Sequence, residues 1–193
     1  MTTLLEADTD RLLAAVRALL VQKGIATPEE IAERIESTDA ASPALGARMV
    51  ARAWVDPEFR ALMLSDGARA AETLGIVMRG APPLGVMECT EDTHVLVVCT
   101  LCSCYPRAVL GYPPYWYKSA AYRARAVREP RGLLAEFGTV LPEGTRIRLV
   151  DSTADYRWMV LPLRPPGTED WDEDRLAAIV RAGDMIGVTQ VHA

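Results

Sequence analysis

The sequence predicts an α+β protein in which a helical arm, residues 1–79, precedes a core of helices and strands, residues 80–193. In the first part, apolar residues recur at the spacing of amphipathic helices, whereas short β-branched runs typical of strands follow later. The stretch Gly80–Gly85, rich in glycine and proline, separates the two patterns and indicates a turn-rich boundary. With 193 residues, half of them hydrophobic, the chain can bury one substantial core.

Five helices are expected in the arm. Apolar residues at helical spacing predict the first over residues 4–22. Thr27 and Glu30 form a capping box around Pro28, which begins the second. The remaining three are expected from Ser42-Pro43 through Trp54, from the cap at Asp56-Pro57, and from Asp66 to Gly75. The apolar faces of the arm pack either on the chain's own core or on a partner subunit.

The core is expected to contain five strands and two helices. Strands near 84–88 and 94–98 come first, and the alternation at Ile147 and Leu149 together with residues 156–161 predicts an antiparallel pair. A last strand is expected over Met185–Val191. The helices are expected from the aromatic loop at 112–117 to about Phe137, kinked or restarted at Pro130, and from a cap at Asp170 or Asp172 through Val180.

Three of the four cysteines lie in the stretch Cys99–Cys104, which follows the buried run Val95–Val98 with the spacing C-x-x-C-x-C. In a cytosolic protein such a cluster is more typical of a metal or redox site than of a disulfide framework. The spacing is too tight for two of these thiols to bridge without strain, but it can present three sulfurs to one ion. We therefore treat the cluster as the candidate functional site.

Two kinds of ion fit this spacing. Tetrahedral zinc needs a fourth ligand, and Cys89, His94 and His192 are the remaining candidates. Alternatively, deprotonated backbone nitrogens of Ser103 and Cys104 complete a five-ligand, square-based set with an open sixth position. Only a strongly Lewis-acidic ion such as low-spin cobalt(III) or iron(III) displaces those amide protons. A satisfied core histidine is the preferred interpretation of His94, and a small buried residue that of Cys89.

Composition excludes several classes of function. The net charge of −5 gives no electrostatic footprint for nucleic acid. The sequence contains no run of the ~20 apolar residues that a membrane span needs, and no basic-then-apolar signal opens it. A cytoplasmic protein with reduced thiols is expected.

The segment Val98–Pro106 resembles the metal claw of the nitrile hydratase α subunit, in a family that includes the γ subunit of thiocyanate hydrolase. Matching blocks extend from about Ala51 to Val188, among them Trp116–Lys118 and Asp151–Ala154. The resemblance implies a layered α/β sandwich core behind a helical arm. It also implies a β-type partner subunit that completes the active site, and an activator protein that loads cobalt.

The resemblance assigns chemistry to the claw. It implies that Cys99 stays a thiolate, that Cys102 becomes a sulfinate and that Cys104 stops at the sulfenate. Thr100 and Tyr105 are the residues associated with cobalt, so one cobalt(III) per chain is expected rather than iron(III). The expected ligands are the three cysteines, with the backbone of Ser103 and Cys104.

The implied reaction is the hydration of a small-molecule nitrile to its carboxamide. The attacking oxygen belongs either to the Cys104 sulfenate or to a metal-activated hydroxide, and both alternatives stay open. Cys102, Cys104 and Tyr105 are the expected catalytic residues, with Tyr105 orienting the claw or the bound nitrogen.

Arg107 stands where tryptophan is common in the family. An arginine there suits an anion such as thiocyanate or a polar nitrile such as the nucleoside toyocamycin, unless it turns outward to a partner subunit. Thiocyanate hydrolase, a nucleoside-nitrile hydratase and a structural zinc module are the alternative functions.

Overall fold

The computed structural model describes the chain over residues 2–193, with the side chains of residues 1–8 and 10 outside the described part. The chain divides into two compact units, Met1–Ala40 and Ala41–Ala193. This division falls at residue 40, whereas the change in sequence pattern falls at residue 80. The two differ because helices between residues 43 and 73 pack on the first strand of the second unit.

The first unit is a helical hairpin of α1 (Thr2–Gln22) and α2 (Pro28–Ala40). The predicted capping box is confirmed. The hydroxyl of Thr27 accepts a hydrogen bond from the Glu30 backbone N–H at 3.1 Å, and the Glu30 carboxylate accepts one from the Thr27 N–H at 2.8 Å. Within the hairpin, apolar side chains of both helices line a groove, among them Val21, Ile31 and Ile35.

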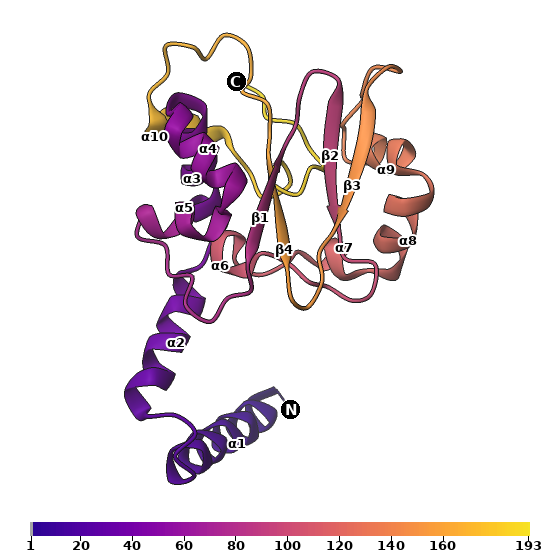
Figure 1. Ribbon diagram of the computed structural model, residues 1–193. Coiled ribbons are helices and arrows are strands. Elements are labelled where there is room, and N and C mark those ends of the chain that lie inside the picture. The colour runs from indigo at the N-terminus through magenta and orange to yellow at the C-terminus, as the bar shows by residue number, and fades with distance from the viewer. Residues whose placement is uncertain (1) are drawn as a thin grey trace. The chain divides into compact units, whose positions relative to one another are not determined.

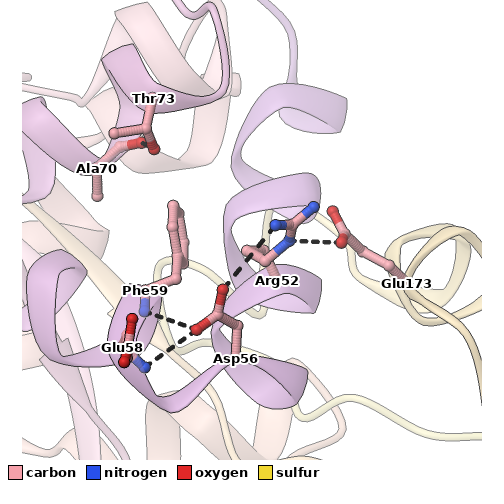
Figure 2. Close-up of polar contacts among 7 residues, drawn as sticks. All are labelled: Arg52, Asp56, Glu58, Phe59, Ala70, Thr73 and Glu173. Carbon is pink, nitrogen blue, oxygen red and sulfur yellow. Dashed lines mark hydrogen bonds and ion pairs between the residues drawn. The ribbon is translucent and has the colours of Figure 1, made fainter.

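Three helices open the second unit: α3 (Pro43–Val55), α4 (Pro57–Ser65) and α5 (Gly67–Thr73). Figure 2 shows Asp56 at the start of α4, where one carboxylate oxygen accepts from the backbone N–H groups of Glu58 and Phe59, each at 3.0 Å. Arg52 donates to Glu173 at 2.6 Å and so connects α3 with α10 (Glu173–Ile179) (Figure 2). The predicted caps at Asp56 and Asp172 are both confirmed.

Four strands form two parallel pairs. Strand β1 (Leu84–Glu88) pairs with β4 (Arg157–Leu161), and β2 (Thr93–Val98) pairs with β3 (Arg146–Asp151). The carbonyl of Met185 accepts from the Val160 N–H at 2.8 Å, and that of Ile186 accepts from the Val97 N–H at 2.9 Å, so the 185–186 segment joins the pairs. Figure 1 shows α3–α5 beside β1, and α8 and α9 beside β3. The predicted mixture of helices and strands is confirmed.

Two strand predictions are wrong. Strands β3 and β4 do not form an antiparallel pair, because each pairs in parallel with an earlier strand across a long connection. Met185–Val191 is a series of turns rather than a strand, because the N–H groups of Ile186, Gly187 and Val188 fold back onto the Gly183 carbonyl. Gly187, at φ +82°, lies against the Val95 carbonyl, where a β-carbon would overlap it.

The segment after the claw is helical, in four short pieces: α6 (Arg107–Leu110), α7 (Tyr115–Lys118), α8 (Ala120–Arg128) and α9 (Pro130–Glu136). The predicted restart at Pro130 is confirmed, and a further break occurs at Ser119, whose hydroxyl accepts from the Tyr122 N–H at 3.1 Å. Tyr117 and Tyr122 point into the core beneath the claw and are almost fully buried. In the described residues, no helix combines the length and apolarity required to span a membrane.

Candidate metal centre

The claw, Cys99–Cys104, lies where β2 ends. The sulfur of Cys102 is 3.5 Å from that of Cys99 and 3.3 Å from that of Cys104, and all three lie within 4.8 Å of one another. The Cys102 backbone N–H donates to the Cys99 sulfur at 3.2 Å, which holds the turn closed. Among the described side chains, those of residue 9 and residues 11–193, this is the one group of three or more His, Cys, Asp or Glu placed to hold a metal ion.

Asp151, at the end of β3, holds the middle of the claw. One carboxylate oxygen accepts from the Thr100 backbone N–H at 3.0 Å, and the other accepts from the Thr100 hydroxyl at 2.5 Å. The next residue, Ser152, donates its N–H to the Val98 carbonyl at 2.7 Å. The parallel pairing of β2 with β3 therefore brings Asp151 to the claw, since the carboxyl ends of both strands lie at one edge.

Two buried tyrosines hold the claw from the core side. The Tyr122 hydroxyl donates to the Val97 carbonyl at 2.7 Å, two residues before Cys99. The Tyr117 hydroxyl donates to the Cys104 carbonyl at 2.8 Å, at the end of the claw. Burial raises the pKa of both phenols well above the usual value of 10, so both are protonated donors at neutral pH.

The pKa values of Cys102 and Cys104 differ, although their sulfurs are in contact. Hydrogen bonds from Cys104 and Cys99, and then from the Ser103 backbone, lower the pKa of the exposed Cys102 to about 7. Burial, followed by the interactions with Cys102 and Cys99, raises the pKa of Cys104 to about 12. Cys102 is therefore the first of these two thiols to deprotonate, and a cation has to displace the proton of Cys104.

Tyr105 and Arg107 line a pocket of about 100 Å³ beside the claw, together with Arg157 at the start of β4. The Tyr105 hydroxyl and the Arg157 Nη1 are both buried, and neither has a hydrogen-bond partner among the described residues. Arg107 is exposed, with its guanidinium 4.3 Å from the ring centroid of Tyr112. Two of the residues that line the pocket therefore carry a buried donor with no partner in the described part of the chain.

The alternative zinc ligands do not join the claw. The Val95 N–H donates to the Cys89 sulfur at 3.3 Å, and Val95 lies four residues before Cys99 along an extended strand, about 13 Å away at ~3.3 Å per residue. His94 bonds through Nε2 to the Gly187 carbonyl at 2.7 Å, which confirms it as a satisfied core histidine. His192 lines a different pocket with both of these residues.

Comparison with known proteins identifies the family. The family model described as nitrile hydratase, alpha chain, matches residues 7–189. The chain is 48% identical over 177 residues to the alpha subunit of a low-molecular-weight cobalt-containing nitrile hydratase from Rhodococcus rhodochrous, covering 91% of this chain and 85% of that one. The chain belongs to the nitrile hydratase alpha-chain family.

The family also includes relatives named for another reaction. The gamma subunit of thiocyanate hydrolase from Thiobacillus thioparus is 42% identical over 193 aligned residues, with 94% of this chain and 79% of the relative covered. A solved recombinant thiocyanate hydrolase with partially modified cobalt centres superposes with a TM-score of 0.84, at 40% identity, over 96% of this chain and 90% of that one. A variant of the Fe-type nitrile hydratase from Comamonas testosteroni gives 0.81, at 41% identity and with 97% and 92% covered.

The sulfur geometry fits the metal claw expected for this family. With a metal–sulfur bond of about 2.3 Å, two sulfurs at a right angle are about 3.3 Å apart, and two at the tetrahedral angle are about 3.8 Å apart. The 3.3 Å separation of Cys102 and Cys104 is near the right-angle value, whereas the 3.5 Å separation of Cys99 and Cys102 lies about midway between the two. The three sulfurs are thus spaced closely enough to share one metal ion.

The sequence did not predict three residues that lie at the claw or at the pocket beside it: Tyr117, Asp151 and Arg157. Tyr117 belonged to an aromatic run typical of core packing, and Asp151 lay in a block that carried the family resemblance. The position of Asp151 at the end of a strand would have placed it beside the claw had β3 been paired in parallel with β2. The residues next to Arg157 in the sequence do not indicate that it lines the pocket beside the claw.

Proposed function

We propose that this chain is the metal-bearing subunit of a cobalt-type nitrile hydratase, which adds water to a nitrile, R–C≡N, to give the carboxamide, R–CO–NH₂. The observation that carries this proposal is the claw, whose three sulfurs lie within 4.8 Å of one another at the end of β2. Three soft sulfur ligands suit a transition metal. The 48% identity to a cobalt-containing nitrile hydratase subunit supports cobalt as the metal.

The proposed ligands are the sulfurs of Cys99, Cys102 and Cys104, with the backbone nitrogens of Ser103 and Cys104. One cobalt(III) bound there supplies a Lewis acid that makes the nitrile carbon more electrophilic. Cys102 and Cys104 are proposed to carry sulfinate and sulfenate oxygens, and the Cys104 oxygen is the chain's own candidate nucleophile.

Tyr105 and Arg107 are proposed to bind the substrate. The Tyr105 hydroxyl is buried without a partner in the described part of the chain, so it can donate to the substrate nitrogen or to an ordered water. Arg107 lines the same pocket, and its cationic side chain would favour a polar or anionic group there. Thiocyanate hydrolysis is the second candidate, because a cationic side chain at this pocket suits an anion.

A β-type subunit is the proposed partner, and an activator protein the proposed source of cobalt. Large apolar side chains stay exposed around the claw: Leu101 is 84% exposed, Tyr112 63% and Tyr115 89%. Such side chains beside an active site are suited to burial by a second subunit. We also propose that the enzyme works in the cytoplasm, where the thiols stay reduced until cobalt is loaded.

The test is metal analysis and turnover of the complex of this chain with its β-type subunit, produced with cobalt. We expect one cobalt per chain, nitrile hydration, and about three added oxygens by mass, confined to the claw peptide. Serine at position 99, 102 or 104 is expected to abolish cobalt retention or activity, because a hydroxyl poorly replaces a thiolate. Stoichiometric zinc without cobalt, or full activity in any of the three variants, would contradict the proposal.

A further inference from the structure

The two ends of the claw are held in different ways. At its start, strand β2 is held by backbone hydrogen bonds on both sides: Val97 donates to Ile186 at 2.9 Å, and Ser152 donates to Val98 at 2.7 Å. After Val98 the chain leaves the sheet. Among the described contacts, the Cys104 carbonyl is held by a side chain, the Tyr117 hydroxyl, at 2.8 Å.

Tyr117 is rigid enough to serve as an anchor. Its side chain is fully buried, and its ring packs edge-on against Tyr105 with the ring centroids 5.0 Å apart. It also packs against Tyr122, with the ring centroids 5.5 Å apart. Tyr117 thus contacts both the carbonyl of the last sulfur ligand and the ring of the residue that follows it. A buried tyrosine packed against two other rings has little freedom to move.

We propose that Tyr117 is a positioning residue, which holds the Cys104 end of the claw so that its sulfur stays within coordination distance of the other two. The inference rests on the proposed metal site. At the Cys99 end, the backbone hydrogen bonds of β2 hold the chain in place. At the Cys104 end, the inference assigns this role to the Tyr117 hydroxyl. Loss of the hydroxyl frees the Cys104 carbonyl and lets its sulfur move away from Cys102, which lies 3.3 Å from it.

Tyr122 supplies a matched control. It is also almost fully buried, and it also donates to a backbone carbonyl, that of Val97, at 2.7 Å. The backbone ladder already holds that part of the chain. Replacement of either tyrosine by phenylalanine removes one buried hydrogen bond and keeps the ring, so both variants are expected to lose similar thermal stability. Only Tyr117→Phe is expected to increase the rate at which the metal is released.

The experiment uses the cobalt-loaded complex and measures cobalt release into excess chelator, the sulfur-to-cobalt charge-transfer absorption, and the thermal midpoint. Tyr117→Phe is expected to release cobalt roughly tenfold faster than wild type, which corresponds to about 1.4 kcal/mol, and to shift the absorption band. Tyr122→Phe is expected to stay within about twofold of wild type with its band unmoved. Equal release from both variants, or no change in either, would overturn the positioning role.

Two further outcomes separate this inference from the proposed function. If the wild-type complex holds cobalt but hydrates no nitrile, the proposed reaction is wrong, and the release rates still decide the role of Tyr117. If Tyr117→Phe does not fold, a fluorinated tyrosine at position 117 keeps the ring and the hydroxyl and changes only its strength as a donor. The band is then expected to shift for substitution at position 117 and not at 122; an unmoved band refutes the inference.

Discussion

Replacement of Asp151 by asparagine tests whether the end of β3 holds the claw. The carboxylate accepts two hydrogen bonds from one residue, from the Thr100 N–H at 3.0 Å and from its hydroxyl at 2.5 Å. Asparagine keeps the shape and one acceptor, but it turns an amide NH₂ toward the other donor and removes the charge. A hydrogen bond to a charged group contributes about 1.5–3 kcal/mol. Because both residues are exposed, we expect the lower end, about 1.5 kcal/mol.

The assay is urea unfolding of the full chain, with the free energy of unfolding obtained by linear extrapolation at an unchanged slope. Asp155→Asn is the matched control, since this exposed aspartate lies four residues further along the chain and, among the described contacts, its carboxylate makes none with the claw. A double-mutant cycle with Thr100→Val isolates the contact and is expected to give a coupling of about 1 kcal/mol. If Asp151→Asn destabilises no more than Asp155→Asn, or if the coupling is zero, Asp151 does not hold the claw.

Three other predictions follow from the structure. Arg107→Trp should lower kcat/KM for a polar or anionic substrate by about tenfold and raise it for simple apolar nitriles, and unchanged selectivity would exclude Arg107 from the pocket. Burial lowers the pKa of His94 below 6.5, so the unfolded chain binds its proton first as pH falls. His94 should therefore cost stability below pH ~6.5, by up to about 1.4 kcal/mol per pH unit, and pH-dependent unfolding should show this slope lost in His94→Gln and kept in His192→Gln. Gly187→Ala should prevent soluble folding, whereas Gly138→Ala, at a similar φ of +85° but in open space, should cost only about 1–2 kcal/mol.

Local chemistry made most of the helices predictable. A capping side chain acts within three residues of its helix start, so Thr27, Asp56 and Asp172 could be identified from their neighbours alone. The claw was predictable for the same reason, because its three sulfurs lie within six residues. Such features need no knowledge of how distant segments meet.

Strand pairing could not be predicted in this way. The alternation at Ile147 and Leu149 indicates a strand, but it does not say which strand pairs with it. Proximity in sequence favoured an antiparallel pair with residues 156–161, whereas the fold pairs each strand in parallel with one that lies more than 50 residues earlier. The turns after Gly183 were mistaken for a strand because buried apolar residues occur in both.

The wrong pairing and the missed contacts of the claw have one cause. In a parallel pair, the residues that follow both strands lie at the same edge of the sheet. The end of β3 therefore places Asp151 beside Thr100, which follows β2. A claw fixed in this way holds its sulfurs 3.3 and 3.5 Å apart through contacts that the protein itself supplies. The parallel topology therefore shapes the claw, and Asp151, about 50 positions from it in the sequence, is expected to affect how tightly the claw holds the proposed metal.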